Sequence, residues 1–336
     1  MKSIKPILLL TIFFLCLQKG FGQSAAELHT TARTFMQQGD YANAVLVLNR
    51  ATQLAPQNIE ILKDLAMGYY LQRDNNKALE VIKPLLDRED ADDQCYQIAG
   101  NIYQQLNLSK ERDKLYRKGI KRFPESGPLY NELGLLLFDQ KDIFAITQWE
   151  KGIEVDPNYS KNYYNACKYY NSTTNKVWSI LYGEIFVNME PLNASATEVK
   201  SILLESYKRL FVNINLTKDN NDKSKFIQAF IETMNKQTLV AASGINAESI
   251  TMIRTRFILD WFQGNAAKFP FQLFDLQKQL LQDGIFDAYN QWIFGSVQNL
   301  AAYQNWTVTH STDYNDFSRF QKGRIFKLPA AQYYRY

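Results

Sequence analysis

Few side chains in this sequence have the types and spacing that catalysis or metal binding needs. The histidines are His29 and His310, and neither stands near cysteines or carboxylates at metal-ligand spacing. An acidic run over residues 89–93 lacks the glycine and the fixed ligand order of a calcium loop, so a solvated turn is the better interpretation. No glycine-rich phosphate loop, nucleophile elbow or paired-cysteine metal motif occurs. The sequence therefore predicts no catalytic residue, no metal site and no cofactor.

The first 22 residues have the composition of a secretory signal peptide. Lys2 and Lys5 precede an apolar run of 11 residues, Ile7 to Leu17, and Gly20-Phe21-Gly22 offers small residues for cleavage before Gln23. A membrane-spanning helix is the alternative, but it needs roughly 20 apolar residues. We expect export and no stable membrane span after signal removal. The signal resembles those of exported Bacteroidota proteins, which implies a periplasmic or envelope-associated location in a Gram-negative bacterium.

The charge balance argues against nucleic-acid binding. The whole chain has 38 basic and 34 acidic side chains, a net charge of +4. Cleavage after residue 22 removes Lys2, Lys5 and Lys19, which leaves 35 against 34, or +1. Binding to nucleic acid depends largely on neutralising phosphates, so a nearly neutral chain is not expected to bind it.

Similar residues recur about every 34 positions and divide much of the chain into repeats. These repeats would position any functional side chain. Pro56, Pro124, Pro157 and Pro191 are separated by 68, 33 and 34 residues, and Asp90 stands at the midpoint of the longest interval. Within each period, small residues alternate with large ones at helical spacing, as two packed antiparallel helices require. These positions include Leu28, Ala32, Ala44 and Leu48; Leu65, Ala66, Ala78 and Ile82; Tyr96, Ala99, Tyr116 and Gly119; Tyr130, Gly134, Ala145 and Trp149; and Tyr163, Ala166, Ser179 and Gly183.

This array resembles the tetratricopeptide repeat family over residues 25–193. The resemblance implies an all-α fold, a right-handed α-solenoid of about five helix pairs, with a concave face that the first helix of each pair lines. That face binds protein or peptide partners in the family. The corresponding positions here are His29, Arg33, Lys63, Tyr70, Gln97, Asn101, Gln104, Asn131, Tyr164 and Lys168.

The groove positions are rich in amides, which can pair with the backbone of an extended peptide. The family's clamp of Lys, Asn and Arg for a C-terminal carboxylate is not reproduced, because only Lys63 and Asn101 fall at comparable offsets. Capture of a C-terminus is therefore not predicted. For any single polar residue, a solvated helix face is the simpler interpretation.

The cysteines are predicted to be unmodified. Cys16 lies in the signal, and Phe13-Phe14-Leu15 before it lacks the small residue of a lipoprotein signal. Cys95 and Cys167 fall two repeats apart, beyond the roughly 7 Å between Cα atoms that a disulfide allows. We expect both to be buried small hydrophobes.

The period fades after Pro191, and residues 194–322 are predicted to form a helical C-terminal domain or cap. Its expected helices cover residues 195–210, 224–241, 246–262, 270–283 and 286–306, and residues 323–336 are expected to be an extended or disordered tail. Residues 257–336 contain 19 aromatic side chains. They predict either an aromatic core that closes the solenoid or a surface for a partner or glycan, centred on residues 287–292.

Taken together, these patterns favour a non-catalytic scaffold or adaptor of the cell envelope that binds a segment of a partner protein. The alternative is that residues 194–336 are an enzyme or a glycan-binding module, with the repeats as a spacer. Self-association of the solenoid is a third possibility.

Overall fold

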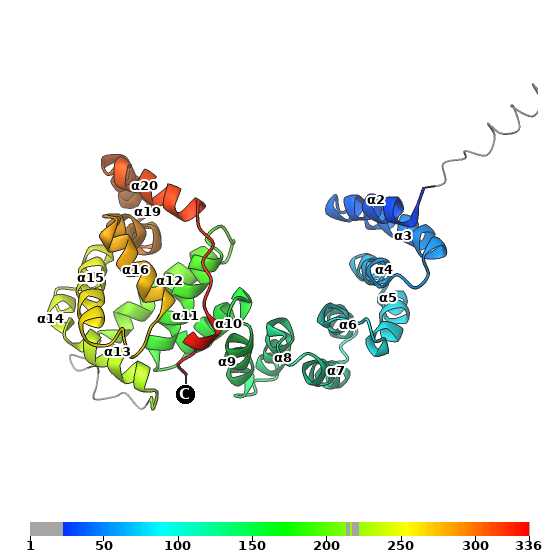
Figure 1. Cartoon of the computed structure of the whole chain (residues 1–336), viewed down its shortest axis with the longest axis horizontal. Helices are drawn as coiled ribbons and strands as arrows, with labels where there is room; N and C mark the ends of the chain where they lie inside the picture. The colour runs from blue at the N-terminus through cyan, green and yellow to red at the C-terminus, as the bar shows by residue number, and fades with distance from the viewer. Residues whose placement is uncertain (1–22, 213–215, 217–221, 336) are drawn as a thin grey trace, which may run out of the picture. The chain divides into compact units, whose positions relative to one another are not determined.

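The computed structural model of this chain describes residues 23–212, 216 and 222–335, and each regular element among them is a helix (Figure 1). The predicted all-α fold of consecutive helix pairs is confirmed. The chain divides into two compact units, Met1–Leu115 and Tyr116–Tyr336.

The helices of the first unit begin at side-chain caps. Ser24 forms a capping box with Glu27, and Asp40, Asn58 and Asp74 accept backbone N–H groups of the next three helices. The elements are α2 (Ala25–Gln37), α3 (Tyr41–Leu54), α4 (Ile59–Leu71), α5 (Asn75–Ile82), the 3-10 helix η1 (Lys83–Asp87), α6 (Asp93–Gln105) and α7 (Ser109–Arg122), which runs past residue 115.

The turn inside each of the first four pairs contains one residue with left-handed backbone. These residues are Gly39, Arg73, Asn107 and Lys141, with φ of 77°, 66°, 56° and 60°. Each stands 34 residues after the previous one, so the backbone itself repeats with the predicted period. Only Gly39 adopts this conformation without the steric cost of a Cβ.

Small residues allow the helices of each pair to approach closely. In the first unit Ala32, Ala44 and Leu48 are fully buried between packed helices. In the second unit, a Cβ at Gly134 would lie 2.4 Å from Nε1 of Trp149. The repeat helices of that unit are α8 (Gly127–Asp139), α9 (Ala145–Val155), α10 (Ser160–Asn171) and α11 (Lys176–Met189).

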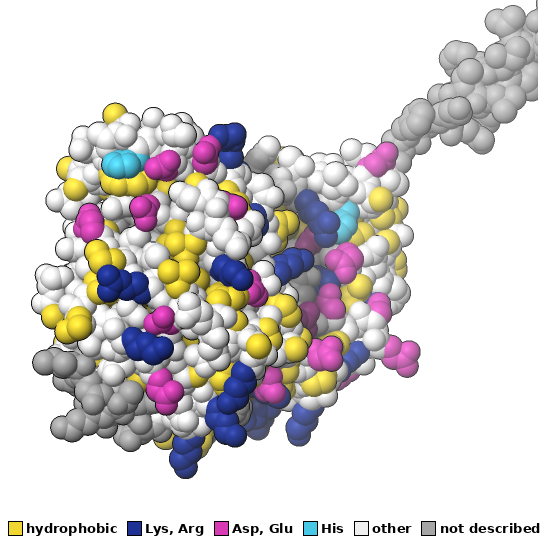
Figure 2. All heavy atoms as spheres, turned by 60° about the vertical axis from the view of Figure 1, so that its left-hand side comes forward, with side chains coloured by type: hydrophobic (Ala, Val, Ile, Leu, Met, Phe, Trp, Pro, Cys, Tyr) yellow, Lys and Arg dark blue, Asp and Glu magenta, His cyan; other side chains and the backbone are white. Residues whose placement is uncertain are grey.

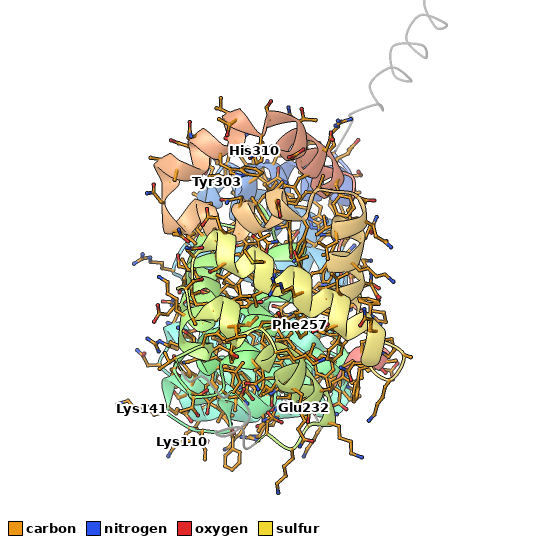
Figure 3. All side chains as sticks on the ribbon, turned by 90° about the vertical axis from the view of Figure 1, so that its left-hand side faces the viewer. Lys110, Lys141, Glu232, Phe257, Tyr303 and His310 are labelled. Atoms are coloured by element: carbon orange, nitrogen blue, oxygen red, sulfur yellow. The ribbon has the colours of Figure 1, made fainter. Side chains whose placement is uncertain are left out.

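The C-terminal helices pack around an aromatic core. Phe226, Phe257, Trp261 and Phe274 are at most 2% exposed, and Figure 3 shows Phe257 on α15. The elements are α12 (Ala196–Leu210), α13 (Lys225–Asn235), α14 (Thr238–Ala241), α15 (Ala247–Gly264), α16 (Gln272–Gln282), α17 (Phe286–Asn290), a π-helix η2 (Gln291–Gly295), α18 (Ser296–Gln298), α19 (Leu300–Thr309), α20 (Ser311–Lys322) and the 3-10 helix η3 (Ala330–Gln332).

Two of the predicted long helices are interrupted. The helix expected over residues 224–241 ends at Asn235 and resumes at Thr238. The helix expected over residues 286–306 widens into η2 and then stops at Asn299, whose extended backbone and side-chain bond to the N–H of Ala302 make it the cap of α19. Asparagine favours such capping over a helix interior, which explains the break.

Residues 324–335, which we call the arm, follow α20 as an extended segment apart from η3. Leu328 and Phe326 of the arm are buried, whereas Ile325 is exposed. Cys95 and Cys167 are buried free thiols, and burial raises their pKa values to about 11 and about 12. No helix among the described residues is long and apolar enough to cross a bilayer.

Candidate functional site

The predicted groove positions of the first unit lie on α2, α4 and α6. In this unit α4 contacts both α2 and α6. We call these positions the polar face, and they are His29, Arg33, Lys63, Tyr70, Gln97, Asn101 and Gln104.

Two side chains of the polar face, those of His29 and Arg33, share one carboxylate. Nε2 of His29 and Nε of Arg33 each lie 2.7 Å from Oδ2 of Asp64 on α4. The hydrogen bond and the negative charge of Asp64 raise the pKa of Arg33. These interactions link α2 to α4 and leave little uncompensated charge at this end of the face.

Lys63 is likewise engaged inside the unit. Its ammonium lies 2.7 Å from Glu60 and 2.5 Å from Asp92, and its side chain is only 3% exposed. Burial opposes the charged form of Lys63, but the hydrogen bonds from the two carboxylates raise its pKa overall. This lysine therefore ties α4 to the N-terminal cap of α6.

The uncharged members of the polar face remain accessible. Tyr70, Gln97 and Asn101 are half-buried and Gln104 is exposed. The first unit thus presents three amides and one phenol to a ligand, beside the exposed side chain of Arg33, which is paired with Asp64.

The predicted positions of the second unit are occupied by contacts with their neighbours. Asn131 is 1% exposed and its Oδ1 accepts from Asn165 at 2.7 Å, so it belongs to the core. Tyr164 donates to Glu198 of α12 at 2.6 Å, and Lys168 lies 2.8 Å from the same carboxylate. These side chains connect the last repeat to the C-terminal helices.

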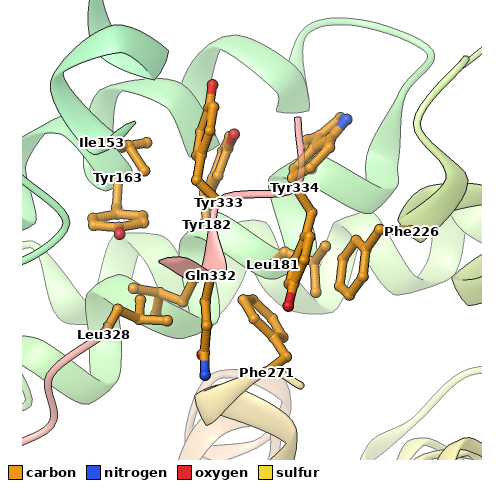
Figure 4. Close-up of a pocket in the computed structure, with 12 residues that line it drawn as sticks. Ile153, Tyr163, Leu181, Tyr182, Phe226, Phe271, Leu328, Gln332, Tyr333 and Tyr334 are labelled. Atoms are coloured by element: carbon orange, nitrogen blue, oxygen red, sulfur yellow. The ribbon is translucent and has the colours of Figure 1, made fainter. Parts of the chain in front are cut away.

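A crevice lies between the helices of the second unit and the arm (Figure 4). Its enclosed space is about 20 Å³, room for roughly one water molecule, and the crevice is partly open to solvent. Figure 4 shows Tyr334 beside Phe226, with Gln332 and Tyr333 pointing to opposite sides of the arm. The lining residues are Ile153, Tyr163, Trp178, Leu181, Tyr182, Ile185, Phe226, Phe271, Leu328, Gln332, Tyr333 and Tyr334.

Comparisons with known proteins identify the repeats. Two family models described as tetratricopeptide repeat match residues 35–102 and 93–126. Residues 35–126 are therefore similar to tetratricopeptide repeats. A search of curated protein sequences found no match.

Several solved structures are similar to this chain. A protein from Thermus thermophilus has 17% identity and a TM-score of 0.46, over 54% of this chain and 100% of its own. A protein from Parabacteroides merdae has 16% identity and a TM-score of 0.42, over 78% of this chain and 98% of its own. The MamA fragment from Desulfovibrio magneticus has 15% identity and a TM-score of 0.40, over 52% of this chain and 100% of its own.

The carboxylates beside the crevice are functional candidates that the sequence reasoning missed. Glu150 follows Trp149 in the second helix of the fourth repeat and is 2% exposed. It shares a buried stripe with Ile146, Trp149 and Ile153, at positions i, i+3, i+4 and i+7. A glutamate at an apolar position of a repeat helix was the available signal, because a buried carboxylate needs a partner.

The segment predicted as the centre of an aromatic binding surface is instead part of the core. Tyr289 and Trp292 are 1% and 9% exposed, so residues 287–292 do not present their aromatic rings to a ligand, and that prediction is wrong. Tyr289 donates to Glu184 of the last repeat at 2.8 Å, and Arg254 forms a buried ion pair with the same carboxylate. Aromatic content alone cannot separate these outcomes, because cores and interfaces are both rich in aromatic residues.

On the face that Figure 2 turns forward, acidic, basic and hydrophobic side chains are interspersed. No group of three or more potential metal ligands occurs among the described residues. Tyr303 and His310 lie on the α19–α20 pair, as Figure 3 shows, and His310 stacks on Trp306 with ring centroids 4.5 Å apart.

Proposed function

We propose that this protein is a non-catalytic scaffold that holds an extended segment of a partner protein on the polar face of α2, α4 and α6. The main support is the difference between two groups of side chains within that face. His29, Arg33 and Lys63 are paired with carboxylates of the same unit, whereas Tyr70 and the amides are accessible and carry no charge.

Amides suit this task because each carries both a donor and an acceptor. Gln97, Asn101 and Gln104 stand along one stripe of α6 at spacings of four and three, so they can follow the main chain of an extended peptide. Such contacts read the backbone more than the side chains of the partner. We infer a tolerant sequence preference, with Tyr70 providing apolar contact.

The proposed location is the cell envelope of a Gram-negative bacterium. The support is the signal-like sequence of residues 1–22, which lie outside the described residues. An envelope scaffold would meet partner segments that are unfolded or extended after export.

Photo-crosslinking tests the proposed binding face. A photoreactive amino acid at Gln97 should crosslink in the native envelope to one segment of a partner, whereas the same probe at Gln53 on the exposed side of α3 should not. Equal crosslinking at both positions, or crosslinks only to further copies of this chain, would argue against the proposal.

Titrations with the identified segment then test the chemistry. Tyr70→Ala with Asn101→Ala should weaken binding by about tenfold or more, because a lost hydrogen bond and a lost aromatic contact each contribute about 1 kcal/mol. The matched pair Gln53→Ala with Asn76→Ala should leave the affinity unchanged.

The salt dependence of binding is a separate test. Because the cations of the face are already paired, raising the salt concentration tenfold should change affinity by less than about threefold. A steep salt dependence would contradict binding through uncharged amides.

A further inference from the structure

Helix α19 lies on the surface of the second unit although much of it is apolar. Its ten residues, LAAYQNWTVT, include leucine, valine, tyrosine and tryptophan, and the structure describes all of them. None of these residues is buried. Figure 1 shows α19 beside α20 at the edge of the C-terminal helices. Exposed apolar residues that gather on one element mark contact sites.

The inner side of α19 contacts the rest of the fold through its aromatic residues. The Tyr303 ring meets that of Tyr314 on α20 edge-on, with the ring centroids 6.3 Å apart. Tyr303 and Trp306 are both half-buried, and α19 also contacts η2 and α18. These contacts fix the orientation of the helix, so the fold also determines which residues form its outer side.

The outer side of α19 carries two large apolar side chains. Leu300 is 59% exposed and Val308 is 74% exposed. Gln304 stands midway between them and is exposed as well. Residues four apart lie on the same side of a helix, so these three form one line along it. We call Leu300, Gln304 and Val308 the α19 stripe.

The α19 stripe lies in a part of the sequence without charge. Residues 288–312 contain no Asp, Glu, Lys or Arg. Exposed helix positions elsewhere in the second unit carry charges, as in the ion pairs Lys151–Glu154 and Glu205–Arg209. A charged surface repels a second copy of itself, whereas an uncharged surface meets its copy without repulsion. The α19 stripe therefore fulfils one condition for contact between two copies of this chain.

The order of residues in the stripe is symmetric about its centre. Leu300 and Val308 each stand four residues from Gln304, or about 6 Å along the helix axis. When two stripes lie antiparallel across a two-fold axis at Gln304, Leu300 of one copy meets Val308 of the other, and the reverse contact forms at the other end. Each copy then covers both exposed apolar side chains of the other.

Gln304 suits the position on the two-fold axis, where a residue faces its own copy. A primary amide carries both donors and an acceptor, so each of two glutamines can donate to the carbonyl oxygen of the other. A lysine or glutamate at this position would face a like charge. Insertion into a lipid bilayer is disfavoured, because hydrocarbon offers no hydrogen-bond partner to the amides of Gln304 and Asn305.

We propose that α19 is a self-association site, at which the α19 stripes of two copies of this chain pack antiparallel around a two-fold axis through Gln304. The contact involves no residue of the polar face, so its test is independent of the proposed partner binding. A helix of this length spans about 15 Å, and an interface built on it is smaller than the roughly 1,200 to 2,000 Å² typical of stable complexes. The dimer is therefore weak and reversible.

Sedimentation velocity of the full chain, without its predicted signal, tests self-association. The weight-average mass should rise from that of a monomer toward twice that value as the protein concentration is raised to about 1 mM, a range in which even a millimolar Kd is detected. Gln304→Glu and Gln304→Lys should each associate about tenfold or more weakly, because each variant places two like charges against one another at the axis. Both replacements are good helix formers at an exposed position, and circular dichroism checks the fold.

Mixing these two variants gives the sharpest test. A Gln304→Glu chain and a Gln304→Lys chain should form a mixed dimer within about threefold of the wild-type affinity, since opposite charges then face each other. This rescue occurs only when residue 304 faces its own copy. A mixture that stays monomeric, while the wild-type chain dimerises, would overturn the proposed axis and with it the proposal.

Substitutions at the ends of the stripe test the antiparallel arrangement. A mixture of Leu300→Glu with Val308→Lys should associate, because the introduced carboxylate of one chain faces the introduced ammonium of the other. A mixture of Leu300→Glu with Leu300→Lys should not, since residue 300 does not face its own copy. The reverse result would show parallel packing and contradict the proposal.

Gln282→Glu and Gln282→Lys are the matched controls, at an exposed glutamine of α16. Each alone should dimerise like the wild-type chain. A wild-type chain that stays monomeric up to about 1 mM, or a Gln304→Lys chain that dimerises as well as the wild type, would show that α19 is not a self-association site. Flotation of the wild-type chain with phosphatidylcholine vesicles, lost in Leu300→Glu, would assign the stripe to a membrane surface instead.

Discussion

Lys200 on α12 places a positive charge in an unusual environment. Its side chain is 8% exposed, and its ammonium lies 3.8 Å from the ring centroid of Trp292, a residue of the π-helix η2. Burial lowers the pKa of Lys200 to about 8. The folded protein therefore binds fewer protons than the unfolded chain between about pH 8 and the ordinary lysine pKa of about 10.4, and stability rises with pH across that window.

Lys200→Met should stabilise the protein at pH 7 by about 1 to 2 kcal/mol, since desolvation of the ammonium outweighs its attraction to the Trp292 ring. Urea unfolding at pH 7 and pH 10 measures the effect, and the gain should shrink toward pH 10, where the wild-type lysine is neutral. Lys208→Met, at an exposed position of the same helix, is the control and should be nearly neutral at both values. A less stable Lys200→Met at pH 7 would mean that the cation–π contact dominates.

At the residue scale, the sequence predicted the helix positions of side chains better than it predicted the residues that they contact. The family pattern assigned Asn131 to a groove, but its burial depends on Asn165, which stands one period later and donates to it. Lys63 was predicted as a groove cation, yet Glu60 and Asp92 enclose it. The spacing of residues along a helix predicts the direction of each side chain. Which side chains of two helices meet depends on the distance between the helices, and that distance cannot be obtained from the spacing.

At the scale of the element, close approach inside a helix pair should be sensitive to a single methyl group. Gly134→Ala places a Cβ 2.4 Å from Nε1 of Trp149, whose ring is buried, so the helices must move apart. We expect a loss of about 1 to 3 kcal/mol in the free energy of unfolding. Thermal and urea unfolding of the full chain measure it.

Gly264→Ala provides the matched comparison in another helix of the same unit. A Cβ at Gly264 meets nothing within 4 Å, so the substitution should change the free energy of unfolding by less than about 0.5 kcal/mol. Equal effects of the two substitutions would contradict the packing described for α8 and α9.

The repeat elements could be predicted because their signals are local. The prolines and the small residues recur at the period that the backbone also shows. The C-terminal helices were harder to predict from the sequence. The π-helix η2 and the break at Asn299 depend on capping and on the tertiary packing of a continuous apolar run. The interruption between α13 and α14 has no strong signal in residues 224–241.

At the scale of the whole molecule, the sequence of residues 1–22 predicts that the chain is processed during export. Expressed in a Gram-negative host, the full chain should yield a mature protein that starts at Gln23 in the envelope fraction. Mass spectrometry of the N-terminal peptide checks this. Leu10→Arg interrupts the apolar run and should leave the precursor uncut, whereas Gln18→Arg adds the same charge outside the run and should be processed normally; processing of both would argue against a signal peptide.

The contact between Glu150 and Arg335 also has a consequence for biosynthesis. The two residues are separated by 185 positions, so a ribosome working at about 5 to 20 residues per second needs about 10 to 40 seconds to supply the second after the first. During that interval the nascent helices of the fourth and fifth repeats hold an acid group without its counter-ion. We expect these helices to reach their final packing only after the arm has been translated, although their own residues are synthesised earlier.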